Sequence, residues 1–117
     1  LLGLILDFLK SYDKERDRNI LSLAEKLIDI LGKYSMNSTI LTINRFQIIA
    51  RKRELELEER KILAQIKYSE NIFERCCACI LLKQFDEFDI HIQQLSAIEK
   101  EEFYSWPIAS LLPNLEE

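Results

Sequence analysis

The chain has 117 residues, of which 48% are hydrophobic and 31% charged, and this length suits one domain with a single modest core. Valine is absent, and glycine and proline number only two each, so an all-β sandwich or barrel, a flexible linker and a collagen-like chain are excluded. The formal net charge of −4 argues against a dedicated nucleic-acid binder.

The apolar runs are too short to cross a membrane, because a span needs about 18 apolar residues or more. The longest run, residues 1–9, is interrupted by Asp7 and lacks the basic region and cleavage site of a signal peptide. Three clustered cysteines, an odd number, indicate a reducing compartment. We therefore expect a cytoplasmic protein without membrane contact. Since residue 1 is leucine and not methionine, we also expect a fragment or module of a longer chain.

The first half of the sequence has helical periodicity. Apolar residues recur at i, i+3, i+4 and i+7 over 1–9, which predicts an amphipathic helix, and the polar stretch 11–18 predicts a connection. Asp17 is positioned to cap a second helix, which Gly32 is expected to end. The inward face of this second helix is predicted to contain Ile20, Leu23, Ala24, Leu27, Ile28 and Leu31.

A third helical pattern starts at Thr39, with Asn37 and Ser38 as candidate N-caps. Two interpretations remain open for 39–68: one long helix, or two helices that meet near Leu55. A helix of that length would be far longer than average, and only two apolar residues lie in 51–60. We favour a break at 53–56.

The second half predicts shorter helices. A polar connection at 69–71 precedes an apolar helical face over 72–81, and the apolar spacing continues beyond a tight turn near Gln84. Ser96 and Glu99 form the S-x-x-E pattern of a capping box, which predicts a helix from Ala97.

Two prolines mark the end of the chain. The helix from Ala97 is expected to end near Ser105, because Trp106 precedes Pro107. Pro107 suits the first position of a last short turn, which Pro113 closes. The whole pattern predicts an all-α fold, a single domain over 1–117 built as an antiparallel array of six or seven helices.

The segment 71–95 resembles the helix-turn-helix unit of tetratricopeptide-like repeats. The matching residues are Leu82-Lys83-Gln84-Phe85-Asp86-Glu87-Phe88, followed by Ile92 and Leu95. Lys83 replaces the usual turn glycine of that family, and Phe88 replaces its usual alanine. The resemblance implies a packed helix pair in the second half of the chain.

A longer stretch, 43–112, resembles a C-terminal helical region of uncharacterised proteins from low-GC Gram-positive bacteria. The shared residues are Ile43-Asn44-Arg45-Phe46-Gln47, the acidic segment 54–59, Ile80-Leu81-Leu82, Phe85-Asp86-Glu87-Phe88, Leu95-Ser96, 99–103 and Trp106-Pro107-Ile108. This resemblance implies a helical architecture and a bacterial origin, and it implies no activity.

The cysteine cluster and the single histidine raise the possibility of metal or redox chemistry. Cys76 and Cys79 form a C-x-x-C, but zinc normally takes four ligands and no second pair is present. We interpret Cys76, Cys77 and Cys79 as small buried residues between helices, and His91 as an ordinary helical residue. We predict no enzyme, no bound metal and no cofactor, with an enzyme or metal protein built on these residues as a rival class.

A basic cluster could contact phosphate groups. It consists of Arg45, Arg51, Lys52 and Arg53. The acidic segment 54–59 follows directly, so ion pairing along the helix and ordinary solvated charge explain both sets of charges. A nucleic-acid-associated accessory domain is the alternative function.

The favoured function is a protein-interaction or regulatory module that acts by surface complementarity. The partner would be another protein or a second copy of the chain, as a homodimer through the first helix. The predicted surface is Leu1, Leu4, Ile5 and Phe8, and the second choice is Phe103, Tyr104 and Trp106. The aromatic residues have a competing role, since such clusters also attach a C-terminal segment to a core.

Overall fold

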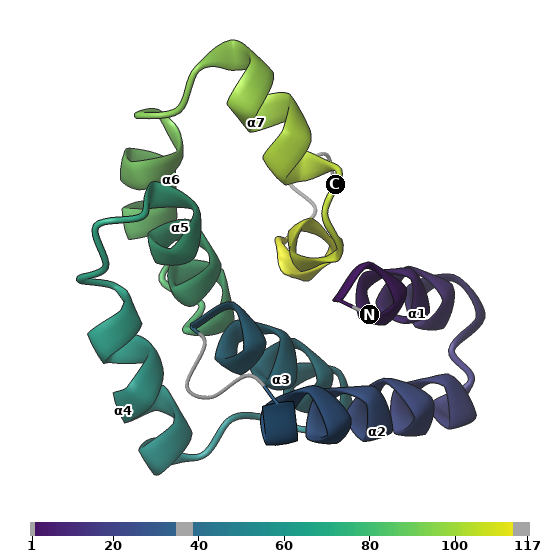
Figure 1. Cartoon of the computed structure of the whole chain (residues 1–117). Coiled ribbons are helices and arrows are strands. Elements are labelled where there is room, and N and C mark those ends of the chain that lie inside the picture. Colours follow the sequence, from purple (N-terminus) through teal and green to yellow (C-terminus); the bar gives the residue numbers. More distant parts are fainter. Residues whose placement is uncertain (1, 35–38, 114–117) are drawn as a thin grey trace. The chain divides into compact units, whose positions relative to one another are not determined.

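The computed structural model of the chain describes residues 2–34 and 39–113. Their regular structure consists of seven α-helices and one 3-10 helix, without a strand, which confirms the predicted all-α class (Figure 1). None of the described helices combines the length and the apolar character that crossing a lipid bilayer requires. The chain divides into two compact units, residues 1–54 and 55–117; the single domain predicted from the sequence stays a prediction.

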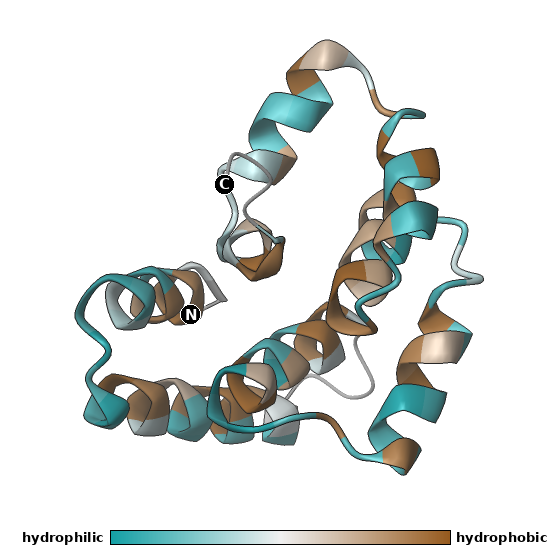
Figure 2. Cartoon of the chain, turned by 180° about the vertical axis from the view of Figure 1, so that it is seen from behind, coloured by the Kyte–Doolittle hydropathy of each residue, from teal (hydrophilic) through white to brown (hydrophobic). Residues whose placement is uncertain are grey.

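The described residues of unit 1 form three helices. They are α1 (Leu2–Glu15), α2 (Arg18–Tyr34) and α3 (Thr39–Lys52). Helix α2 packs against both α1 and α3. Its ribbon alternates between hydrophobic and hydrophilic residues in Figure 2, as the periodicity predicts. A core cluster of this unit is formed by Ile5, Leu9, Tyr12, Leu21, Ala24, Ile28 and Ile48.

Two predicted boundaries in unit 1 are wrong. Helix α1 continues to Glu15, through most of the predicted connection at 11–18, because Tyr12 extends the apolar stripe by one turn and is buried. Helix α2 continues past Gly32, which does not have a positive φ and so does not end the helix. The predicted cap is confirmed, since the Asn19 N–H donates to Oδ1 of Asp17 at 2.9 Å. The candidate caps at 37–38 lie outside the described residues.

The break favoured at 53–56 is confirmed. Helix α3 ends at Lys52, and α4 (Leu57–Ile66) begins four residues after Arg53. Glu56 occupies the N-cap of α4 in an extended conformation, and its N–H donates to Oε1 of Glu59 at 2.7 Å. The carboxylate of Glu59 thus replaces the hydrogen-bond acceptor that an uninterrupted helix would supply.

Unit 2 is arranged around one central helix. It contains α4, α5 (Ile72–Leu81), α6 (Phe85–Ile92), α7 (Ala97–Tyr104) and the 3-10 helix η1 (Pro107–Leu111). Helix α5 packs against α4, α6 and η1, and its six residues from Cys76 to Leu81 are all buried. Figure 1 shows α5 and α6 side by side.

Local signals set the boundaries of these helices. Asn71 caps α5 by accepting hydrogen bonds from two backbone N–H groups, at 2.8 and 3.3 Å. The capping box predicted at Ser96 is present, with Ser96 N–H to Glu99 Oε1 at 2.9 Å and Glu99 N–H to Ser96 Oγ at 3.2 Å. Pro107 begins η1 as predicted.

The turn between α5 and α6 has a residue in the left-handed region. Lys83 has a φ of 62°. Its N–H donates to the carbonyl of Ile80 at 3.0 Å, and the N–H of Gln84 donates to the carbonyl of Cys79 at 2.9 Å. This pair of bonds is the Schellman arrangement, in which glycine is usual because it alone avoids steric strain there. The turn fixes the direction in which α6 leaves α5.

Candidate functional site

The surface predicted on the first helix is divided between core and solvent. Leu4 is 44% exposed, whereas Ile5 is fully buried in the core of unit 1. Phe8 is partly buried and packs against the same core. Leu1 lies outside the described residues. On this helix, Leu4 and the accessible part of Phe8 therefore remain available to a partner.

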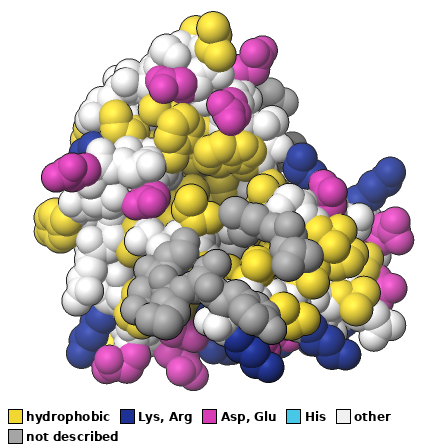
Figure 3. All heavy atoms as spheres, in the orientation of Figure 1, with side chains coloured by type: hydrophobic (Ala, Val, Ile, Leu, Met, Phe, Trp, Pro, Cys, Tyr) yellow, Lys and Arg dark blue, Asp and Glu magenta, His cyan; other side chains and the backbone are white. Residues whose placement is uncertain are grey.

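A second apolar surface lies on α2. Leu23 is 47% exposed and Ile30 is 44% exposed, and Leu27 between them is partly buried against the core. Residues at i, i+4 and i+7 lie along one side of a helix, so these three residues form a line that we name the α2 stripe. The periodicity of the sequence predicts that Leu23 faces the core, and this prediction is wrong. Figure 3 shows hydrophobic side chains gathered over the α1 region of the face in view.

The C-terminal aromatic residues mainly belong to the core of unit 2. Phe103 is fully buried, and its ring centroid lies 6.4 Å from that of Phe73, 5.8 Å from Phe88 and 5.5 Å from Trp106. Tyr104 is 49% exposed and meets two of these rings edge-on. Of the second-choice residues, Tyr104 alone offers a large exposed surface, since Trp106 is half-buried.

Arg45, Arg51 and Lys52 of the basic cluster are paired with carboxylates of α1 and α2, where the sequence predicted pairing along the helix. Arg51 donates through Nε and Nη2 to the two carboxylate oxygens of Asp13, at 2.7 and 2.9 Å. The other two contacts are Arg45 to Asp29 at 3.1 Å and Lys52 to Glu25 at 2.8 Å. Arg53 donates to the backbone carbonyl of Glu54 at 2.9 Å. Neutralised cations attract phosphate weakly, so this geometry does not favour the nucleic-acid alternative.

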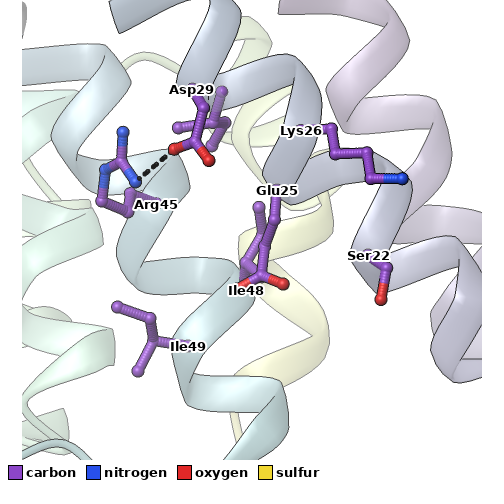
Figure 4. Close-up of a pocket in the computed structure, with 8 residues that line it drawn as sticks. Ser22, Glu25, Lys26, Asp29, Arg45, Ile48 and Ile49 are labelled. Atoms are coloured by element: carbon purple, nitrogen blue, oxygen red, sulfur yellow. Dashed lines mark hydrogen bonds and ion pairs between the residues drawn. The ribbon is translucent and has the colours of Figure 1, made fainter.

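A pocket of about 380 Å³ lies between α2 and α3. The buried residues Ile28 and Ile48 line its inner part, and the ion pair between Arg45 and Asp29 lies at its edge (Figure 4). Two acidic and two basic side chains line the pocket, so it offers no net charge to a charged ligand. Its lining residues are Ser22, Glu25, Lys26, Ile28, Asp29, Arg45, Ile48 and Ile49.

Three potential metal ligands converge in unit 2. Cys79 comes from α5, and Glu87 and His91 come from successive turns of α6. One ligand atom from each residue lies within 4.8 Å of the other two. The sequence alone does not indicate that Glu87 and Cys79 lie close together. The i, i+4 spacing of Glu87 and His91 was a usable signal, whereas the approach of Cys79 depends on how α5 packs against α6.

The three thiols are held in their neutral form. Burial raises the pKa of Cys76 from 9.0 to about 12, with a smaller contribution from Cys79. Burial also raises the pKa of Cys77, assisted by Cys76 and Glu74. The pKa of Cys79 is raised by burial and by the Glu87 carboxylate, while Lys67 acts in the opposite direction. The predicted burial of all three cysteines is confirmed.

No protein-family model, curated protein or solved structure matches this chain. The surfaces and side-chain clusters described above therefore provide the basis for a functional proposal.

Proposed function

We propose that the chain is a helical protein-interaction module whose unit 1 binds a helical partner. The observation that supports this proposal is the α2 stripe. Leu23 and Ile30 remain nearly half exposed although the unit has a separate buried core. Anchors at i, i+4 and i+7 are the pattern by which one amphipathic helix binds a groove on another protein.

Leu4 is a further exposed apolar residue of unit 1, on helix α1, which packs against α2. Burying a leucine side chain that is fully exposed contributes roughly 1.5–3 kcal/mol, so three half-exposed aliphatic residues provide a useful part of a binding energy. A second copy of this chain is the first partner to test, because its α2 is itself an amphipathic helix. The bacterial origin, the cytoplasmic location and the tetratricopeptide-like helix pair belong to the same proposal and come from the sequence.

Sedimentation equilibrium over a concentration series tests self-association. We expect the wild-type chain to associate and the double variant Leu23→Glu plus Ile30→Glu to remain a monomer, because each glutamate would have to be desolvated at the interface. Leu4→Glu tests the contribution of α1. The matched control is Ile90→Glu plus Ile98→Glu in unit 2, where both isoleucines are more than 60% exposed. Circular dichroism verifies that every variant is folded.

If the wild-type chain is a monomer, the partner to test for is another protein. The same variants then serve as immobilised baits for a nuclease-treated lysate. A partner that the wild-type and control baits retain, and that the Leu23→Glu plus Ile30→Glu bait loses, supports the proposal. Monomeric behaviour together with identical retention on all baits would contradict it.

A further inference from the structure

The convergence of Cys79, Glu87 and His91 supplies one sulfur, one oxygen and one nitrogen donor within 4.8 Å of one another. Ligands around a tetrahedral zinc ion lie about 3.4–3.6 Å apart, given Zn–S of about 2.3 Å and Zn–N or Zn–O of about 2.0–2.2 Å. Side-chain rotations that move each donor by about 1 Å would therefore suffice, without any change in how α5 and α6 pack.

His91 has a buried ring nitrogen that is available to coordinate a metal. Its Nδ1 is buried and has no hydrogen-bond partner within the described residues. A buried polar atom without a partner destabilises a fold, because its lost hydration is not replaced. A metal ion that coordinates a ring nitrogen would hold the imidazole in place, and would give its second nitrogen a defined tautomer.

One cation already contacts this cluster. Lys67, which follows α4, donates to Oε1 of Glu87 at 2.9 Å and to the side-chain oxygen of Gln84. A carboxylate has two oxygens, so Glu87 can retain Lys67 on Oε1 and present Oε2 to a metal. The thiolate and the carboxylate together offset the two charges of a divalent ion, and Lys67 leaves the site with one positive charge.

We propose that Cys79, Glu87 and His91 form a binding site for a single zinc ion, which joins α5 to α6 and carries water as its fourth ligand. The combination of thiolate, imidazole and carboxylate suits zinc better than magnesium or calcium, which prefer oxygen ligands alone. The side chain of Glu87 is 48% exposed, so the site opens to solvent and an ion has a route of entry. The site lies in unit 2, and it is independent of the surface proposed in unit 1.

Zinc uptake by this site displaces a proton from Cys79, because the thiolate is the ligand. The charged and titratable groups that face this thiol are Glu87 and His91 on α6, Lys67 after α4, and Cys76 on α5. Affinity for zinc therefore rises with pH. Calorimetry in buffers of different ionisation enthalpy measures the number of protons released.

Cobalt titration of the full 117-residue chain under reducing conditions tests the site. Co²⁺ bound here gives a thiolate-to-metal charge-transfer band and the d–d bands of tetrahedral cobalt, with one ion per chain, and Zn²⁺ displaces it. Cys79→Ser abolishes the charge-transfer band. Glu87→Gln and His91→Gln weaken cobalt binding by about tenfold or more.

Matched controls separate this site from binding elsewhere. Cys77→Ser changes a buried thiol of the same helix, and Glu101→Gln changes an exposed glutamate of α7; both variants retain wild-type cobalt affinity. Cys79 is fully buried, so His91→Gln provides the decisive test if Cys79→Ser does not fold.

Three results would overturn the proposal: no saturable cobalt binding near one ion per chain, unchanged affinity in folded His91→Gln, or an equal loss in Cys77→Ser. A zinc-dependent rise in Tm that disappears in His91→Gln would support it independently.

Discussion

Arg51 and Arg45 are both arginines of α3 that pair with an aspartate, but they differ greatly in exposure to water. The side chain of Arg51 is 2% exposed and binds Asp13 through two nitrogens. Arg45 is 46% exposed and its partner Asp29 is 65% exposed. Solvent screens the second pair, whereas the first pair provides a directional contact between α3 and α1.

We predict that Arg51→Lys destabilises the protein by about 1–2 kcal/mol, because a lysine ammonium cannot reproduce the two-nitrogen contact with Asp13. Arg45→Lys is the matched control, and its effect should be below about 0.5 kcal/mol. Urea unfolding followed by circular dichroism measures both. Equal effects of the two substitutions would show that burial of the Arg51 pair does not matter.

The buried thiol of Cys76 makes stability depend on pH at the alkaline end. Its pKa is about 12 in the fold and 9.0 in the unperturbed thiol, so the unfolded chain loses this proton first as pH rises. The stabilisation is fully present below pH 9 and is lost progressively between about pH 9 and 12. We predict that Tm falls over this window, and less steeply in Cys76→Ala. Equal slopes in the two proteins would exclude Cys76 as the cause.

At the scale of elements, the turn between α5 and α6 contains backbone strain that a single substitution removes. Lys83 is exposed and has a φ of 62°. A left-handed conformation costs a non-glycine residue about 1–2 kcal/mol, while glycine loses about 0.5–1 kcal/mol more in backbone entropy on folding. We therefore predict that Lys83→Gly stabilises the protein by about 0.5–1 kcal/mol.

The control for this prediction is Lys100→Gly within α7, which should destabilise by about 1 kcal/mol. Urea midpoints of the two variants should move in opposite directions. A loss of stability in Lys83→Gly would show that the lysine side chain, and not the backbone conformation, determines the stability of this turn.

The predictions that succeeded at this scale depend on neighbouring residues. Asp17, the Ser96–Glu99 box and Pro107 act within three residues of their own position, so the sequence contains all the information that each requires. The break at 53–56 was also predictable, because an apolar stripe could not continue through that segment. The two wrong boundaries arise where packing outweighs local signals, as for Tyr12 at the end of α1.

The candidate sites were much harder to predict, because their residues meet across helices. Arg51 and Asp13 are 38 positions apart, and Lys52 and Glu25 are 27 positions apart. The basic cluster therefore forms ion pairs between helices, although the sequence alone suggests exposed charges. Glu87 and His91 are one turn apart on the same helix, but only the packing of α5 against α6 brings Cys79 to them.

At the scale of the whole molecule, most packed helix pairs are neighbours in the chain. The pairs α1–α2, α2–α3, α4–α5 and α5–α6 all belong to this class. Proteins with mainly local contacts fold in microseconds to milliseconds. We predict a main folding phase faster than about 10 ms, measured by continuous-flow mixing with Trp106 fluorescence for unit 2 and circular dichroism for both units. A dominant phase of seconds would contradict this prediction.

The division of the chain into two units after residue 54 also affects how the protein folds during translation. A ribosome adding about 5–20 residues per second needs about 3–13 s to complete the 63 residues of unit 2. Helices that pack with their neighbours in microseconds to milliseconds have ample time to assemble unit 1 during that interval. A nascent chain therefore exposes the unfinished core of one unit at a time, which limits the apolar surface available for aggregation during translation.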